Sequence, residues 1–251
     1  RSLYLGDPDF FPVPVAQLTD KKYAAVLRDQ IDPLHSSRSS DIKPGLSDGV
    51  PSPKAIKEST ETTHFSTWDK WGNVVSNTYT LNFSYGSGIS VAGAGFLQNN
   101  EMDDFSAKPG SPNGYGLVGG IANAIQPGKR PLSSMTPTIV FDASGMPILA
   151  TGSPGGSTII TIVMQMVLNV IDFDMNVAEA TAAARIHHQW LPEVLMIEEG
   201  FGADTKALLK DKGYRLYPSR TMGSVQAIMM EDGYFYGAAD PRRPSAGVVS
   251  P

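Results

Sequence analysis

Two adjacent threonines, Thr62 and Thr63, follow a polar run and open a stretch of alternating apolar and small polar residues that is typical of a strand. If the chain cuts itself in front of a threonine at such a junction, the new α-amine can act as general base for the hydroxyl of the same residue. Paired threonines at a strand start are also common for structural reasons alone. The pair indicates nucleophilic chemistry only if other parts of the chain support it.

A glycine-rich corner lies where a strand is expected to turn into an apolar helix, at Gly152-Ser153-Pro154-Gly155-Gly156-Ser157. Successive glycines let backbone N–H groups converge on an anion, and the start of a helix favours negative charge. The Lys-Ser/Thr ending of a P-loop is missing. An oxyanion site and a simple tight turn both fit this segment.

Acidic and amide side chains gather in residues 98–105, which include Glu101, Asp103 and Asp104. Such a run could bind a substrate ammonium or a metal, or it could face solvent. The spacing and the glycine of an EF-hand loop are missing. Because Asn82 is close in sequence, recognition of an ammonium group is one interpretation, and a solvated acidic turn is the other.

A pair of serines, Ser133 and Ser134, follows Lys129 and Arg130. Two hydroxyls with a cation nearby could hydrogen-bond a carboxylate. Serine-rich turns often serve only as caps, so both interpretations stay open.

The histidines do not form a metal or hydrolase constellation. His187 and His188 are adjacent and point in different directions, so they cannot form a zinc pair at helical i, i+4 spacing. His64 should lie on the opposite strand face from Thr63. We interpret all three as structural.

Composition bounds the class of protein. The chain has 251 residues, 41% of them apolar, which is enough for a sizeable core. Its net charge of −5, without a basic block, argues against a nucleic-acid partner. The absence of cysteine excludes disulfides, thiolate metal sites and a cysteine nucleophile. The longest apolar run, residues 159–168, is too short to span a bilayer, and an initial Arg1 in place of Met suggests that an upstream segment is missing.

The pattern of the chain predicts an α+β domain, with helices packed on sheets. Residues 31–61 are rich in proline and serine and are expected to form an exposed linker. Residues 106–131 should form a long loop centred on Tyr115, of the kind that often acts as a lid. Strands are expected at residues 63–68, 74–80, 136–141, 147–150, 225–230 and 234–238. Helices are expected at residues 16–30, 177–184 and 204–212, and from the glycine corner to about residue 170.

Taken together, these segments resemble the gamma-glutamyltranspeptidase family. The resemblance runs through nearly the whole chain in order, at residues 4–10, 62–66, 78–82, 97–108, 115–120, 129–135, 151–157, 185–190 and 222–224. It implies a four-layer αββα sandwich of the N-terminal nucleophile hydrolase type, incomplete here because most of the large subunit is absent. It also implies self-cleavage between Glu61 and Thr62. Residues 1–61 would then be the tail of the large subunit, and residues 62–251 the small, catalytic subunit.

The resemblance assigns a role to each candidate residue and implies no cofactor and no metal. Thr62 would be the nucleophile, and Thr80 would orient it. The substrate would be glutathione or another gamma-glutamyl compound, and the acceptor water, an amino acid or a peptide. By the same resemblance, Asn82, Glu101 and Asp104 would bind the α-ammonium of the substrate, and Ser133 and Ser134 its α-carboxylate. Tyr115 would cover the pocket. Gly155 and Gly156 would stabilise the oxyanion.

One departure matters. The family's carboxylate-binding arginine lies upstream of every residue present here, so the remainder of the large subunit is an expected partner. Without it, we expect little activity and poor solubility. A relative that cleaves glutaryl or cephalosporin-type side chains, and an unprocessed scaffold homologue, are the alternatives. A periplasmic or extracellular location is implied by the family alone.

Overall fold

The structure, a computed structural model, describes residues 1–44, 62–113 and 117–250, and it has the predicted α+β composition. Its α-helices are α1 (Val15–Leu18), α2 (Lys21–Asp29), α3 (Ile159–Ile171), α4 (Val177–Ala182) and α5 (Ala203–Asp211). Its strands are β1 (Thr62–Trp68), β2 (Val74–Thr80), β3 (Thr138–Phe141), β4 (Pro147–Gly152), β5 (Ile186–His187), β6 (Leu195–Glu198), β7 (Leu216–Ser219), β8 (Gln226–Glu231) and β9 (Tyr234–Ala239).

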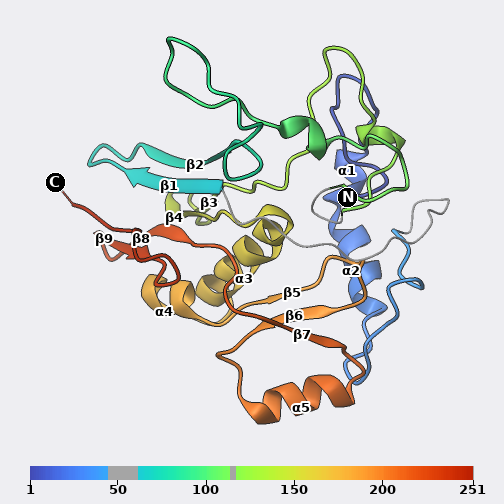
Figure 1. Cartoon of the computed structure of the whole chain (residues 1–251). Helices are drawn as coiled ribbons and strands as arrows, with labels where there is room; N and C mark the ends of the chain where they lie inside the picture. Colours follow the sequence, from blue (N-terminus) through green and yellow to red (C-terminus); the bar gives the residue numbers. More distant parts are fainter. Residues whose placement is uncertain (45–61, 114–116, 251) are drawn as a thin grey trace.

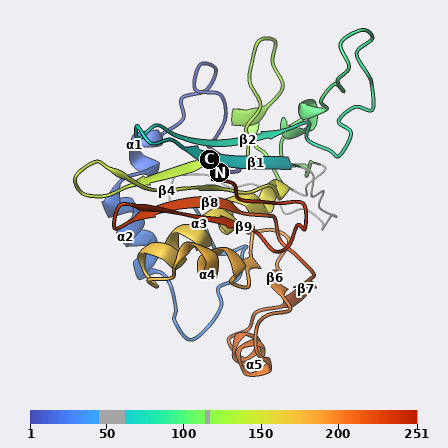
Figure 2. The ribbon, with the colours of Figure 1, turned by 90° about the vertical axis from the view of Figure 1, so that its left-hand side faces the viewer.

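The central layer is an antiparallel sheet with the strand order β3-β4-β8-β9. Helices α3 and α4 cover one face of this sheet, and the β1–β2 hairpin lies over the other (Figures 1 and 2). The main core lies between the sheet and the helices and is formed by Leu149, Ile162, Met166, Val170, Val177, Ala180, Met222, Val225, Ala227 and Ala238. Burial of this apolar surface is the main force that holds the layers together.

Within the described residues, this gives two sheet layers and one helical layer. The outer face of the β1–β2 hairpin exposes Phe65, Val75 and Tyr79, and no helix of the described ranges lies over it (Figure 2). The arrangement agrees with the partly incomplete αββα sandwich that the family resemblance implies, and the helical layer over the β1–β2 hairpin is the one not seen among the described residues.

The hairpin of β1 and β2 confirms the predicted strands and fixes the position of Thr62. Its register pairs Thr62 with Thr80 and Trp68 with Val74. The turn between the strands is closed by the Asp69 carboxylate, which accepts hydrogen bonds from the backbone N–H groups of Trp71 and Asn73. Asparagine and aspartate favour such turns because their short side chains hydrogen-bond to the backbone two or more residues ahead.

The single helix predicted over residues 16–30 is wrong. The chain instead forms α1 and α2, which are separated at Asp20. The Asp20 side chain accepts a hydrogen bond from the backbone N–H of Lys22 and so caps α2. Aspartate is a strong N-cap because it satisfies an otherwise unpaired N–H of the first turn.

The sequence pattern also missed a third sheet, with the order β5-β6-β7. Its strands have only 2 to 4 residues, and β7 contains Pro218. Such short segments show too little alternation to predict a strand. The other predicted helices and strands are confirmed, with ends that differ by one or two residues.

Gly152, the last residue of β4, allows the two sheets to approach closely at His64. The imidazole is 5% exposed and contacts the hydroxyl of Thr78 through Nδ1 at 2.7 Å and that of Ser66 through Nε2 at 3.1 Å. Burial lowers the pKa of His64 to about 4, so the ring is neutral at pH 7. A Cβ added to Gly152 would overlap the ring. This agrees with the structural role predicted for His64.

We therefore expect Gly152→Ala to lower the free energy of unfolding by roughly 1–3 kcal/mol, because overpacking a closed core forces its neighbours to shift. Gly247→Ala is the matched control, since a Cβ there would meet nothing within 4 Å. Thermal unfolding of the two variants and the wild type checks this expectation. Equal midpoints for all three proteins would contradict it.

Candidate active site

Thr62 is the first residue of β1, and its side chain is buried, with 7% of the residue exposed. Its Oγ1 donates a hydrogen bond to Thr80 Oγ1 at 3.2 Å, across the paired strand. Thr80 Oγ1 also accepts a hydrogen bond from the backbone N–H of Asn82 at 2.9 Å. The pairing of β1 with β2 and the hydrogen bond from the Asn82 N–H therefore hold Thr80 Oγ1 in place, and Thr80 Oγ1 in turn orients the Thr62 hydroxyl.

A small hollow opens at the Thr62 hydroxyl. It is lined by Thr62, Thr80, Asn82, Asp104, Ser133, Ser134, Met135, Gly156 and Ile159. Most of the candidate residues predicted from the sequence, separated by up to 94 positions along the chain, thus come together in the lining of one hollow.

Asn82 has a left-handed backbone conformation, with φ at +74°, and is 3% exposed. Its Nδ2 donates to the carbonyl oxygen of Asn100 at 3.1 Å, and Asn100 Oδ1 in turn accepts from the N–H of Phe83. Asparagine adopts this conformation more readily than most residues. These bonds attach the end of β2 to the short 3₁₀ helix Glu101–Asp104 and so position the acidic residues.

The Glu101 and Asp104 carboxyl groups lie side by side and hydrogen-bond to each other. Burial is the main cause that raises the pKa of Glu101 to about 8, and the Asp104 neighbour adds to it. Burial also raises the pKa of Asp104. Glu101 Oε1 is buried and has no hydrogen-bond partner among the described residues. Two close carboxyl groups with an unsatisfied acceptor favour a bound cation such as an ammonium group.

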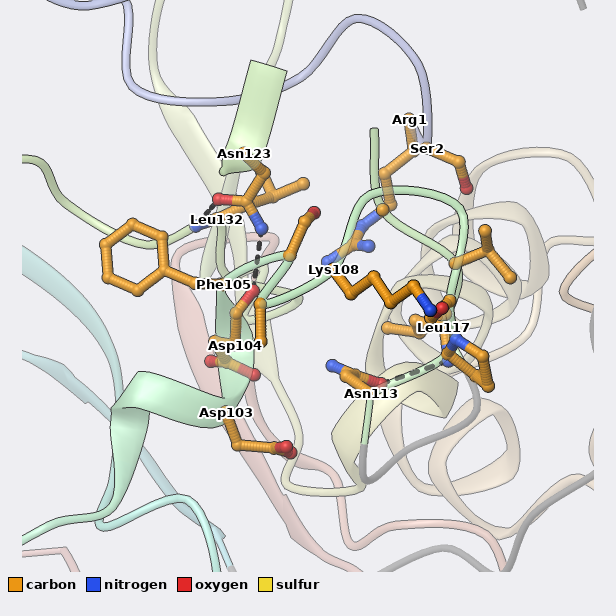
Figure 3. Close-up of a pocket in the computed structure, with 16 residues that line it drawn as sticks. Arg1, Ser2, Asp103, Asp104, Phe105, Lys108, Asn113, Leu117, Asn123 and Leu132 are labelled. Atoms are coloured by element: carbon orange, nitrogen blue, oxygen red, sulfur yellow. Dashed lines mark hydrogen bonds between the residues drawn. The ribbon is translucent and has the colours of Figure 1, made fainter. Parts of the chain in front are cut away.

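Asn123 connects the acidic end of the site to the serine pair, a link that the sequence did not reveal. Its Nδ2 donates to the carbonyl oxygen of Asp104 at 2.7 Å, and its Oδ1 accepts from the N–H of Leu132 at 2.9 Å (Figure 3). Asn123 is 5% exposed. One buried amide therefore sets the spacing between Asp104 and the chain that enters Ser133.

The cation near the serine pair is Arg1. Its Nη2 donates to Ser134 Oγ at 2.8 Å. Arg130, one of the two cations that the sequence placed beside the serines, instead binds the carboxylates of Asp7 and Asp9. The expectation of a cation at the serines is thus met by a residue 133 positions away, which no local pattern could indicate.

The glycine corner provides unpaired backbone donors. Gly155 and Gly156 have φ values of +140° and +55°, which L side chains rarely adopt. Thr158 Oγ1 donates to the Gly155 carbonyl oxygen at 2.6 Å and holds the turn. Within the described part of the chain, the N–H groups of Gly155 and Gly156 have no hydrogen-bond acceptor. Gly156 lines the hollow and Gly155 stands immediately before it.

A buried charge cluster holds the Met222–Ser224 segment, which packs against the glycine corner. Arg185 pairs with Asp240 at 2.6 Å, and Arg242 bridges Asp240 and Glu198. Arg185 Nη1 and Glu198 Oε1 also hydrogen-bond to the backbone of Met222. Two residues further along, the N–H of Ser224 donates to Ser153 Oγ at 3.0 Å. Buried charges are stable only when paired in this way, so the cluster rigidly fixes the segment that packs on the glycines.

Several candidates are not part of the hollow's lining. Glu101 does not line the hollow but hydrogen-bonds to Asp104, which does. Glu61 and Tyr115 lie outside the described residues.

Arg243, which the sequence did not indicate, has its Nη1 3.5 Å from the Thr62 carbonyl oxygen. Among residues 1–44, 62–113 and 117–250, no His, Cys, Asp or Glu cluster could hold a metal, and no helix is long and apolar enough to cross a membrane.

A threonine at the first position of a strand, two stacked sheets with helices over one face, and a glycine corner in the same hollow as the threonine are typical of an N-terminal nucleophile hydrolase fold. Solved structures agree with this class. The chain is similar to the cephalosporin acylase from Bacillus halodurans, with a TM-score of 0.74 and 25% identity over 95% of this chain and 40% of that one. The chain belongs to the gamma-glutamyltranspeptidase family, whose model matches residues 1–250.

Two relatives show how close the similarity is. The glutathione hydrolase proenzyme of Escherichia coli K12 is 57% identical over 243 residues, which cover 96% of this chain and 40% of that protein. A variant of the Helicobacter pylori gamma-glutamyltranspeptidase is 57% identical, with a TM-score of 0.69, over 72% of this chain and all of that one. The chain spans about 40% of the length of the curated relatives it matches.

Proposed function

We propose that this chain carries the catalytic part of a gamma-glutamyl hydrolase and transferase that matures by cutting itself between Glu61 and Thr62. The observation that carries the proposal is that one hollow beside Thr62 is lined by a carboxylate residue, a serine pair and a glycine with an unpaired N–H among the described residues. These groups complement an α-ammonium, an α-carboxylate and an oxyanion, respectively.

Maturation supplies the base that the site lacks. In the described residues, Thr62 Oγ1 hydrogen-bonds to Thr80 and to no carboxylate or imidazole. In the precursor, Thr62 Oγ1 attacks the carbonyl carbon of Glu61, the C–N bond breaks as the acyl group moves to oxygen, and water hydrolyses the ester. Cleavage frees the Thr62 amine, which can then accept the proton of its own hydroxyl.

In turnover, Thr62 Oγ1 attacks the gamma-carbonyl carbon of the substrate, and its proton passes to the Thr62 amine. The N–H groups of Gly155 and Gly156 stabilise the oxyanion, an effect typically worth about 3–4 kcal/mol per donor. The amine then protonates the leaving nitrogen, and the C–N bond breaks. The resulting gamma-glutamyl ester is attacked by water or by an acceptor amine, which releases the product and returns the proton to Thr62.

The acidic pair favours gamma-glutamyl over glutaryl substrates, which lack the α-amino group. Asp104 and Glu101 would be left buried and uncompensated with a glutaryl ligand, which costs free energy. Two anilides that differ only in the α-amino group therefore distinguish the proposed function from a glutaryl or cephalosporin-type acylase. We expect release of the chromophore from gamma-glutamyl p-nitroanilide and at least tenfold less from glutaryl p-nitroanilide.

Residues 1–61 and 62–251 belong, in this proposal, to the end of a large subunit and to a small subunit. The solved chain of the Pseudomonas nitroreducens gamma-glutamyltranspeptidase aligns over its whole length with 75% of this chain. Residues 62–251 make up about the same fraction of this chain. The remainder of the large subunit is the proposed partner of the exposed apolar stripe Ile160, Met164 and Leu168 on α3 and of the outer face of β1 and β2. A periplasmic or extracellular location is part of the same proposal and is supported only by the family.

Binding of the substrate ammonium should depend on pH. The Glu101–Asp104 pair keeps a proton up to about pH 8 when no cation is bound, because burial raises the pKa of Glu101 to that value. A bound ammonium favours the ionised pair, so the proton must leave on binding. We expect KM for a gamma-glutamyl substrate to fall by up to about tenfold per unit between pH 6 and 8 and then to level off. Glu101→Gln should flatten this dependence, and a wild-type KM that is constant over this range would contradict the assignment.

Intact mass and N-terminal sequencing of the protein expressed at full length test the proposal directly. A fragment that begins Thr62-Thr63-His64, together with turnover of the gamma-glutamyl anilide, supports it. A single uncut species after long incubation would favour the scaffold alternative instead.

A further inference from the structure

The first eleven residues lie along the loop that delivers the serine pair. The carbonyl oxygen of Ser2 accepts a hydrogen bond from the N–H of Gly120 at 2.8 Å. A Cβ on Gly6 would overlap the backbone of Ala122, so the two segments are in direct contact there. The N-terminal segment therefore contacts this loop at several points between residues 120 and 134.

Asp7 and Arg130 hold the middle of this contact. Asp7 is 4% exposed, and its carboxylate accepts hydrogen bonds from the backbone N–H, Nε and Nη2 of Arg130. These bonds keep the pKa of the Asp7 carboxyl well below its usual range. Arg130 is three residues before Ser133, so this pairing fixes the course of the chain just before the serines.

Arg1 lies at the end of this contact and interacts with both the serine pair and the acidic residues of the site. Its guanidinium donates to Ser134 Oγ at 2.8 Å. It also stabilises the ionised form of Asp104 and so opposes the effect of burial on that carboxyl. Figure 3 shows Arg1 and Ser2 on one side of the pocket next to the hollow, with Asp103 and Asp104 on another.

The bond from Arg1 has a consequence for the Ser134 hydroxyl. A hydroxyl has one hydrogen to donate and can accept at its lone pairs. Because Ser134 Oγ accepts from Arg1, its own hydrogen must point away from the guanidinium. Ser134 also lines the hollow at Thr62, so its hydrogen is available to an acceptor bound there.

We propose that Arg1 is a positioning residue of the glutamyl site, which orients the Ser134 hydroxyl to donate to a ligand carboxylate. This inference rests on the proposed function, since it concerns the same site. Arg1 acts through Ser134, so its loss should weaken binding of the substrate and leave the chemical step nearly unchanged. The contact of the N-terminal segment with the loop holds Arg1 in this position.

The test uses Arg1→Gln and Arg1→Lys in the protein expressed at full length, with wild-type and Ser134→Ala backgrounds. Hydrogen bonds from charged groups are typically strong enough that we expect Arg1→Gln to raise KM for gamma-glutamyl p-nitroanilide about tenfold, with kcat within about twofold. Arg1→Lys should recover part of the loss. In the Ser134→Ala background, Arg1→Gln should change KM by less than about twofold, because coupled residues are not additive.

Arg28→Ala is the matched control, since Arg28 lies on α2 in the same N-terminal part and its side chain is 74% exposed. Calorimetric binding of L-glutamate provides a second readout that does not need turnover. An unchanged KM and glutamate affinity in Arg1→Gln, with or without a lower melting temperature, would overturn the proposal, as would equal effects in both Ser134 backgrounds. If the wild type binds glutamate in an Arg1-dependent way but turns over no gamma-glutamyl substrate, the proposed function fails and the positioning role stands.

Discussion

Thr62→Ala is expected to accumulate as one uncut polypeptide with no measurable turnover of a gamma-glutamyl anilide, a loss of at least about 10⁴-fold. The variant lacks the hydroxyl that lies at the start of β1 and donates a hydrogen bond to Thr80 Oγ1. The same oxygen serves self-cleavage and catalysis in the proposed mechanism, so both activities should disappear together. Denaturing electrophoresis, intact mass and the anilide assay measure the two losses separately.

Thr63→Ala is the matched control for this experiment. Thr63 is the next residue of β1, and its side chain is exposed on the opposite face of the strand from Thr62. It should therefore leave cleavage and kcat within about twofold of the wild type. Thr62→Ser, which keeps the hydroxyl, should retain both activities in part. Cleavage at the normal bond in Thr62→Ala would show that another residue is the nucleophile.

The helices and sheets near the site could be predicted because their residues alternate or repeat over five or more positions. β1 alternates less exposed and more exposed residues from Thr62 to Trp68, and α3 repeats a buried stripe through Ile159, Ile162, Val163 and Met166. Where the periodic signal was weak, prediction failed. A capping residue, Asp20, divided an expected helix, and the short strands of the third sheet carried no pattern to detect.

Some residues of the candidate site could likewise be predicted from the sequence, and others could not. Residue chemistry alone indicated the threonine, the acidic run and the glycine corner, and the family resemblance gave each of them a role. Asn123 and Arg1 were missed because their importance depends on contacts across 19 and 133 positions of sequence. An asparagine in a long loop and an arginine at residue 1 look like ordinary surface residues until the fold is known.

The oxyanion role of the glycine corner makes the second large prediction. Gly155 has a φ of +140°, and a Cβ there would lie 2.6 Å from Thr158 Oγ1, which holds the turn through its bond to the Gly155 carbonyl. Gly155→Ala must therefore shift the backbone and misdirect the N–H groups of Gly155 and Gly156. Because loss of one oxyanion donor typically lowers kcat by about 10²–10³-fold, we expect a fall of that size. Single-turnover assays of the mature enzyme measure it.

Strain at a positive φ could by itself reduce activity, by lowering the fraction of folded enzyme. Gly145→Ala separates the two effects, because Gly145 also has a positive φ, +86°, but lies in the β3–β4 turn with nothing within 4 Å of an added Cβ. Gly145→Ala should lose stability and keep kcat, while Gly155→Ala should lose kcat even in samples shown to be folded by circular dichroism. Equal kcat values for the two variants would mean that the N–H groups of this corner do not stabilise the transition state.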